Sequence, residues 1–286
     1  MLNLTKDSVV VDCTLGSGGH GHAILSCLGS GGTYIGIDAD PTAIATLGKE
    51  FSSYDATVHL VNDNFKNLKS ILDSLSITTV DAILADLGWR MEQFDGSSGL
   101  PRGFSFNQDE PLAMTFGEPS DYAFTAADIV NDWNEEDIAN VIYGYGQDRF
   151  ARRIARAIVA ARKEAPIETA KQLGDIVFHA VPGVARHKKT HPATKTFQAL
   201  RIAVNDEFDT LNDLLIDGFT CLKTHGRMVI ISFHSLEDRM VKETFKTFVR
   251  DQNGVLVHKK PIAPSEEELQ ANPRARSAKL RTIEKV

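Results

Sequence analysis

A glycine-rich turn near the amino terminus is the segment best suited to bind a ligand. It begins after Asp12, which ends an apolar run, and it contains Gly16, Gly18 and Gly19. Glycine has no Cβ, so the backbone of such a turn can come close to a bound molecule. Asp38 ends the next apolar run, where a carboxylate can accept hydrogen bonds from two ribose hydroxyls. The pattern predicts a pocket for a nucleoside cofactor.

Two classes of cofactor compete for this pocket. Gly16, Gly18 and Gly21 match the dinucleotide fingerprint, and Asp38 lies about 20 residues further on, as a nicotinamide cofactor requires. Asp12 favours S-adenosylmethionine, because a carboxylate attracts a cationic ligand and repels a pyrophosphate. We therefore expect S-adenosylmethionine with Asp12 facing it, and a nicotinamide-dependent oxidoreductase is the alternative.

Composition limits the class of protein. The 286 residues are 42% hydrophobic, enough to form one large domain or two smaller ones. No apolar run approaches the roughly 18 residues of a membrane helix, and no signal peptide precedes the first strand pattern. The three cysteines are scattered, and the histidines lack the spacing of metal ligands. We expect a cytoplasmic protein without a membrane segment, a disulfide framework or a metal site.

Charge is distributed unevenly along the chain. The net charge is -7, and residues 1–100 hold 5 basic and 12 acidic side chains, so the remainder is balanced. Three basic clusters lie in this balanced part, at residues 149–163, 186–195 and 274–281. Such clusters can follow the phosphates of a nucleic acid, although a charged run is often only a solvated face.

Strand-like and helix-like segments alternate over the first part of the chain. Parallel strands are expected at residues 9–12, 33–38, 57–61 and 80–86, with helices between them. Residues 88–117 are rich in turn-forming residues, and a helical period then runs over 125–180 and again over 196–222. Further strands are expected at 227–233, 254–258 and 279–283.

The predicted fold class is α/β: a doubly wound, Rossmann-like S-adenosylmethionine methyltransferase sheet with an inserted all-helical subdomain. The expected parts are residues 1–97 and 191–286 for the sheet domain and 98–190 for a helical substrate-recognition insert. Ligands bind at the carboxyl ends of parallel strands, so Asp12, Asp38 and Asp86 should meet there with residues 232–235.

Several blocks of sequence resemble the bacterial RsmH (MraW) family, in the family's order and over nearly the whole chain. They are the glycine loop ending in His20, Asp86-Leu87-Gly88, Arg102-Gly103-Phe104-Ser105-Phe106, Tyr145-Gly146, the run from His191 to Ile202, the run from Ile231 to Arg239, and Asn272-Pro273-Arg274-Ala275-Arg276-Ser277. The sequence departs from the family's usual pattern at residues 89–92 and 112–116 and at Gln147.

The resemblance implies an S-adenosylmethionine-dependent methyltransferase that modifies the exocyclic N4 amine of a cytosine in the decoding region of 16S ribosomal RNA. The partner would be small-subunit ribosomal RNA or the small ribosomal subunit, and a homodimer is left open. Cofactor contacts carried over from the family are Gly18, Gly19, His20, Asp38, Phe65, Asp86 and Gln93. Two alternatives are a methyltransferase for another nucleic acid and a non-catalytic ribosome-assembly factor.

Asp86 is the candidate catalytic residue. Its carboxylate could accept a hydrogen bond from the amine and so localise the nitrogen lone pair, or it could serve only to hold the cofactor. The expected substrate-binding residues are Trp89, Phe104, His191, Arg201, Phe233 and His234. The competing interpretation is that the aromatic rings fill the core and that His234 makes structural hydrogen bonds near a helix start.

Overall fold

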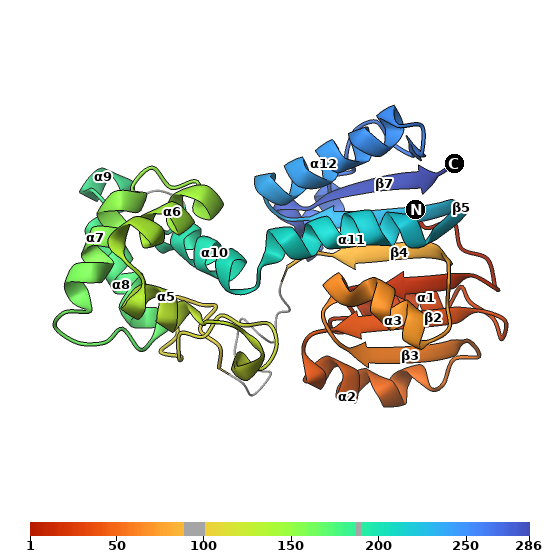
Figure 1. The fold of residues 1–286 in the computed structure, drawn as a ribbon, viewed down its shortest axis with the longest axis horizontal. Helices are drawn as coiled ribbons and strands as arrows, with labels where there is room; N and C mark the ends of the chain where they lie inside the picture. Colours follow the sequence, from red (N-terminus) through yellow and green to blue (C-terminus); the bar gives the residue numbers. More distant parts are fainter. Residues whose placement is uncertain (89–100, 187–189) are drawn as a thin grey trace. The chain divides into compact units, whose positions relative to one another are not determined.

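The computed structural model describes residues 1–88, 101–186 and 190–286. The chain divides into two compact units (Figure 1). The sheet unit contains residues 1–88 and 208–286, and the helical unit contains residues 89–207. The helical unit is therefore inserted between two parts of the sheet unit.

Seven strands form one sheet within the described residues of the sheet unit. They are β1 (Val9–Asp12), β2 (Thr33–Asp38), β3 (Thr57–Asn62), β4 (Val80–Asp86), β5 (Leu222–Ser232), β6 (Gly254–Leu256) and β7 (Lys279–Lys285). Their order is β3-β2-β1-β4-β5-β7-β6, and the first five are parallel while β7 pairs antiparallel with β5 and β6. The predicted α/β, Rossmann-like fold class is confirmed.

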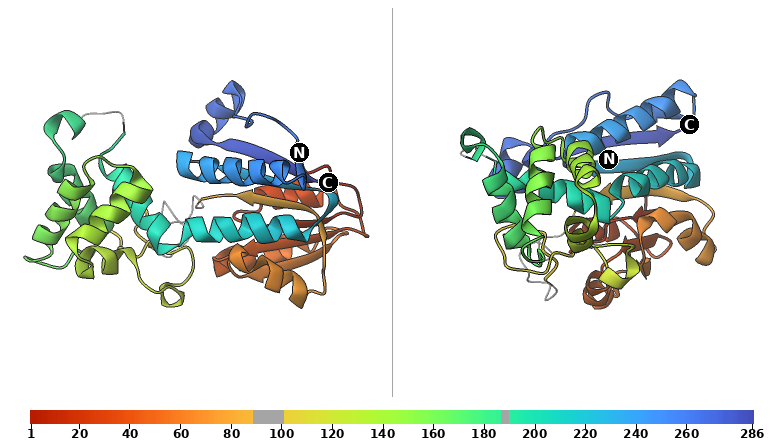
Figure 2. Two further views of the ribbon diagram at one scale, coloured as in Figure 1. Left: turned by 45° about the horizontal axis from the view of Figure 1, so that its top comes forward. Right: turned by 60° about the vertical axis from the view of Figure 1, so that its left-hand side comes forward.

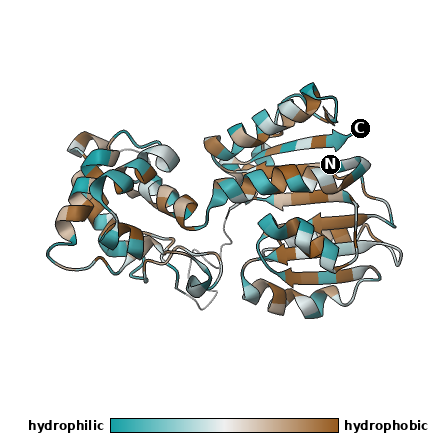
Figure 3. Cartoon of the chain, viewed as in Figure 1, coloured by the Kyte–Doolittle hydropathy of each residue, from teal (hydrophilic) through white to brown (hydrophobic). Residues whose placement is uncertain are grey.

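Helices cover both faces of this sheet because successive strand residues point in opposite directions. Val10 and Tyr34 pack with α1 (Gly19–Leu25) and α2 (Pro41–Phe51), whereas Val11 and Ile35 pack with α3 (Leu68–Ser74), α11 (Glu207–Cys221) and α12 (Ser235–Arg250). Figure 2 gives further views of these helices, and Figure 3 shows hydrophobic residues along the strands. A strand buried on both faces needs a continuous apolar run, as at residues 9–11.

The helical unit has its own apolar core. Its helices are α5 (Ala126–Asp132), α6 (Glu135–Gly146), α7 (Ala151–Ala161), α8 (Ala170–Ala180), α9 (Gly183–Arg186) and α10 (Ala193–Val204). Side chains cap the first two of these helices, since Thr125 accepts from the Asp128 N–H and Asn134 accepts from the Asp137 N–H. None of the described helices is long and apolar enough to cross a membrane.

The second boundary of the insert lies further along the chain than the sequence predicted. The expected boundary was 190/191, but the helical unit extends through Glu207, because α10 packs against α5, α6 and α8. The single helix expected over 196–222 is two helices. The helical conformation is interrupted at Asp206, whose φ of 48° is left-handed. The side chain of the preceding Asn205 donates a hydrogen bond to the Met114 carbonyl.

Candidate functional site

The loop after β1 is held in place by backbone contacts with the neighbouring strands. The N–H of Cys13 donates to the Leu84 carbonyl of β4 at 2.8 Å, and the N–H of Leu15 donates to the Ile37 carbonyl of β2 at 3.0 Å. Gly18 has φ of 82°, and a Cβ there would lie 2.7 Å from Leu47 Cδ2. Gly19 has open space around it. The turn therefore requires glycine at position 18, and position 19 leaves room beside the loop.

Asp38 ties the end of β2 to this loop. Its Oδ2 accepts from the Gly16 N–H at 2.8 Å, and its Oδ1 accepts from the Asp40 N–H at 2.9 Å. The Asn62 side chain at the end of β3 donates to the Asp38 carbonyl at 2.9 Å. Phe65 follows, half-buried against the sheet core. The expected ribose ligand and the expected adenine neighbour thus follow adjacent strand ends.

Asp12 does not face a ligand, contrary to the prediction. Its side chain is fully buried, with Oδ2 accepting from the Tyr34 hydroxyl at 2.9 Å and Oδ1 accepting from the Thr14 N–H at 3.2 Å. Burial raises the pKa of this carboxyl from 3.8 to about 6. The alternating strand directions place Asp12 inside the α1–α2 layer beside Tyr34, where its role is to organise the loop.

Asp86 is the acid at this edge with a buried oxygen still available. Its N–H donates to Thr14 Oγ1 at 2.7 Å, and its Oδ2 lies 3.4 Å from His20 Nε2. Among the described residues no group hydrogen-bonds to its buried Oδ1. The hydrogen bond to Asp86 raises the pKa of His20 despite partial burial, so the imidazolium is favoured beside this carboxylate. Oδ1 is an acceptor that a bound ligand could satisfy.

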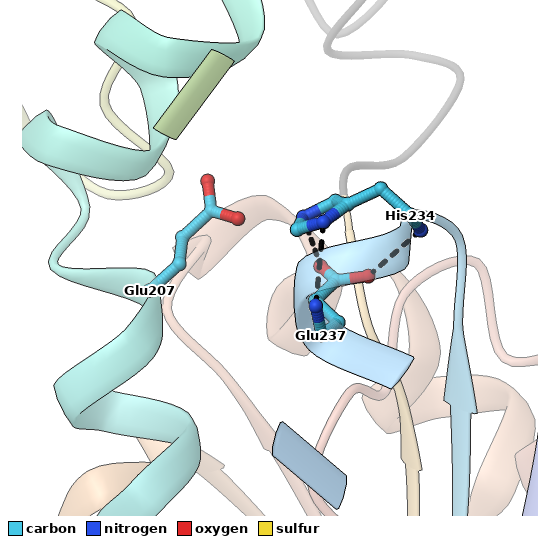
Figure 4. A group of neighbouring side chains, drawn as sticks. All are labelled: Glu207, His234 and Glu237. Atoms are coloured by element: carbon cyan, nitrogen blue, oxygen red, sulfur yellow. Dashed lines mark hydrogen bonds and ion pairs between the residues drawn. The ribbon is translucent and has the colours of Figure 1, made fainter. Parts of the chain in front are cut away.

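His234 lies between the end of β5 and the start of α12 (Figure 4). Phe233 directly precedes it in the sequence. The Glu237 side chain accepts from the N–H groups of both residues, at 2.9 Å and 3.3 Å. His234 Nε2 also lies 3.0 Å from Glu237 Oε1. The Glu237 N–H donates to His234 Nδ1 at 3.4 Å, which together with the His234 N–H bond to Glu237 makes a capping box. His234 therefore has the structural role of capping α12. Its predicted substrate role stays a prediction, as does that of the half-buried Phe233.

The expected substrate residues of the helical unit make internal contacts. Phe104 is 7% exposed in the core and its ring stacks on Phe116, so its face is not available to an RNA base. This prediction is corrected: Phe104 is a packing residue. Arg201 binds Glu207 through two hydrogen bonds of 2.6 Å and 2.8 Å and is only 11% exposed. The positive charge of Arg201 is therefore paired with Glu207 inside the helical unit, and its substrate role stays a prediction.

His191 lies in a stack of aromatic rings in the same unit. Its ring is 4.4 Å from that of Phe106 and 5.7 Å from that of Phe178, nearly parallel to both. Burial lowers the pKa of His191, so the neutral ring is favoured. Its substrate role stays a prediction. Trp89 and Gln93, expected at the substrate and the cofactor, lie outside the described residues.

Three residues that position the site were missed in the sequence. Thr14 joins the loop to the Asp86 N–H, Tyr34 holds Asp12, and Asn62 joins β3 to β2. Thr14 and Asn62 lie beside predicted strand ends, so their positions in the sequence could have indicated that they contribute to the site. Tyr34 gave none, because an aromatic residue within a strand is usually only a core residue.

A family model for the MraW methylase family matches residues 1–286. The chain belongs to this family. The resemblance inferred from the sequence blocks is thus confirmed, and membership in a methylase family supports a methyltransferase over the nicotinamide-dependent alternative. The cofactor-binding roles of Gly18, Gly19, His20, Asp38, Phe65 and Asp86 stay predictions, now with coordinates for each.

Similar proteins extend over the full chain. Each of three MraW-family relatives is named ribosomal RNA small subunit methyltransferase H, and all are matched by 100% of this chain. The protein from Acetivibrio thermocellus is 45% identical over 95% of its length, that from Brevibacillus brevis 43% over 94%, and that from Clostridioides difficile 41% over 95%. A solved rRNA methylase from Streptococcus thermophilus is 14% identical, with a TM-score of 0.42 over 99% of this chain and 89% of its own.

Proposed function

We propose that the protein transfers a methyl group from S-adenosylmethionine to the N4 amine of a cytosine in the decoding region of small-subunit ribosomal RNA. Family membership and the names of the relatives support a small-subunit rRNA methyltransferase. The observation that carries the proposal is Asp86, a strand-end acid with a buried oxygen and no hydrogen-bond partner for it among the described residues.

The residues at the sheet edge fit this cofactor. Asp38 can accept from ribose hydroxyls, since each carboxylate oxygen accepts more than one hydrogen bond. Gly19 leaves the loop open, and Phe65 offers a half-buried ring at the next strand end. The carboxylate of Asp86 favours a ligand with a positive charge. When bound, S-adenosylmethionine supplies an electrophilic methyl carbon on a sulfonium.

The main task of the protein is to position the acceptor nitrogen and remove its proton. The lone pair of a cytosine amine is delocalised into the ring, which makes the nitrogen a weak nucleophile. Asp86 Oδ1 can accept a hydrogen bond from this amine and localise the pair, and it can take the proton that N4 loses once it is methylated. His20 Nε2, 3.4 Å from Oδ2, helps to orient the Asp86 side chain.

The test is methyl transfer from labelled S-adenosylmethionine to small ribosomal subunits that lack the modification, and in parallel to naked rRNA. The product nucleoside is identified by mass spectrometry. We expect N4-methylcytidine from the decoding region. A methyl group on carbon 5 of cytosine or on another base would overturn the N4 assignment. Cofactor binding without any methylated nucleoside would favour the non-catalytic alternative.

A further inference from the structure

Charge is segregated within the helical unit. Residues 103–148 contain ten Asp and Glu and no Lys or Arg, whereas residues 149–195 contain eleven Lys and Arg and only three Asp and Glu. The change occurs at the turn between α6 and α7. A concentrated positive region in a chain of net charge -7 is expected to attract a polyanion.

The arginines of α7 lie on one face. Arg152, Arg153 and Arg156 are spaced at i, i+1 and i+4 on α7 and are exposed, away from the buried residues of the helix, and the exposed Arg149 lies in the turn just before it. Arg156 is paired with Glu135 at 3.6 Å. Among the described residues, no carboxylate lies within ion-pair distance of the other three. The Arg149 guanidinium packs over the Phe150 ring, 4.6 Å from its centroid. These three arginines can therefore meet an external anion without breaking an ion pair to a described carboxylate.

An exposed aromatic ring lies on α6, just before this turn. Tyr143 is 68% exposed, and it is the aromatic residue among the exposed large hydrophobic side chains of the described residues. Gln147, which ends this helix in a left-handed conformation, donates its N–H to the Tyr143 carbonyl at 3.0 Å. The Lys195 ammonium donates to the Gln147 carbonyl at 2.9 Å. Arg149 is two residues further along, so its Cα is at most about 7 Å from that of Gln147.

The position of Lys195 is fixed by a close approach of α10 to α6. A Cβ on Gly146 would lie 2.5 Å from the Lys195 carbonyl oxygen, so glycine is needed for this contact. The α6–α7 surface, defined as Tyr143, Arg149, Arg152, Arg153 and Lys195, thus comprises four cations and one ring from helices that pack against each other.

We propose that the α6–α7 surface binds single-stranded RNA, with its cations on phosphates and Tyr143 stacked on an unpaired base. This inference rests on the proposed function, since it assigns part of the rRNA contact. The cations can contact RNA phosphates. The ring of Tyr143, which is otherwise exposed to solvent, can stack on a base. Bases within an A-form duplex do not expose their faces, so the ring selects a single strand.

The phosphate contacts are tested by the binding of a 15-nucleotide unstructured RNA to the full chain over a range of salt concentrations. The variant R152A/R153A is compared with K49A/K69A, which removes two exposed lysines from α2 and α3 of the sheet unit. We expect R152A/R153A to bind more weakly and its salt slope to fall by about 1.4, from roughly 0.7 per phosphate contact. The lysine variant should match the wild type. Equal affinity and slope in both variants would overturn the proposal.

The ring is tested by Tyr143→Ala, Tyr143→Leu and Tyr143→Trp. Alanine and leucine should weaken binding of the unstructured RNA by roughly 5- to 150-fold, while tryptophan should preserve it, because stacking requires a flat ring. Binding of a 15-base-pair RNA duplex should not change. If all three variants bind alike, or if the duplex binds more tightly than the single strand, the assignment of single-stranded RNA is wrong.

A separate measurement distinguishes this proposal from the proposed function. Cofactor affinity and thermal unfolding of each variant should equal those of the wild type, which shows that the variants fold. If the wild type binds the RNA as expected but transfers no methyl group, the proposed function fails and the surface stands. If it transfers methyl groups and R152A/R153A has an unchanged KM for rRNA, the surface fails alone. If an acidic peptide displaces the RNA and other polyanions do not, the surface binds a protein partner and the proposal is wrong.

Discussion

The sheet edge and the helical unit use charged and aromatic residues in opposite ways. At the sheet edge, Asp12, Asp38 and Asp86 end adjacent strands, and each carboxylate is fixed by contacts with the loop or with His20. In the helical unit, Phe104 and Arg201 belong to family-like sequence blocks yet serve packing and an internal ion pair. At the sheet edge, the strands place the acidic residues of the sequence motifs together. In the helical unit, the motif residues Phe104 and Arg201 stabilise the fold instead.

Replacing Asp86 should have the largest effect on activity. Asp86→Asn removes the proton acceptor at Oδ1 but keeps the shape of the side chain, so we expect kcat to fall by about 10²- to 10⁴-fold. Cofactor affinity should change much less. The exposed Asp73→Asn on α3 is the matched control and should be fully active. Full activity of Asp86→Asn would assign Asp86 to cofactor binding alone or to the fold.

Phe104 and Tyr143 offer a direct contrast between a buried and an exposed ring. Phe104→Ala should lower the free energy of unfolding by about 3–5 kcal/mol, because it leaves a cavity in the helical core. Tyr143→Ala should lower it by less than about 0.5 kcal/mol. Urea unfolding of the two variants measures both values. Similar losses would mean that Tyr143 is a structural residue and would weaken the contrast.

Asp12 should make stability depend on pH. Its pKa is near 3.8 in the unfolded chain and about 6 in the folded protein, so the folded protein binds the extra proton between these values. The free energy of unfolding should therefore fall as the pH rises from about 4 to about 6 and then level off, by about 3 kcal/mol in total. Asp12→Asn should remove this component. Parallel pH profiles of the wild type and Asp12→Asn would show that Asp12 is not buried as described.

A smaller effect than that of Phe104 is expected at Thr14, which connects the loop to the strand that carries Asp86. Thr14→Val leaves the Asp86 N–H without its acceptor and should cost about 1–3 kcal/mol of unfolding free energy. Thr14→Ser keeps the hydroxyl and should restore most of that loss. If Thr14→Val is as stable as the wild type, the hydrogen bond to the Asp86 N–H does not contribute to stability.

The strands and the acids at their ends could be predicted because both follow short-range rules. An apolar run buried on two faces predicts a strand, and parallel strands bring Asp38 and Asp86 to one edge. The side toward which a strand-end residue points is harder to predict. Asp12 ends a strand as Asp38 does, but its carboxylate is buried and accepts a hydrogen bond from the Tyr34 hydroxyl.

The helical unit was less predictable because burial depends on tertiary packing. Nothing local in the sequence distinguishes Phe104, which is buried, from Tyr143, which is exposed. The boundary after Glu207 was missed for a similar reason, since the period of a helix does not reveal that Asp206 adopts a left-handed conformation.

The most direct test of this division of labour measures two ligands on two variants of the full chain. Calorimetry gives the affinity for S-adenosylmethionine, and fluorescence anisotropy gives the affinity for the unstructured RNA without cofactor. Asp38→Ala should weaken cofactor binding at least about tenfold, through loss of charged hydrogen bonds, and leave RNA binding unchanged. R152A/R153A should do the reverse. Equal losses of both ligands in either folded variant would contradict the assignment of the cofactor to the sheet edge and of RNA to the α6–α7 surface.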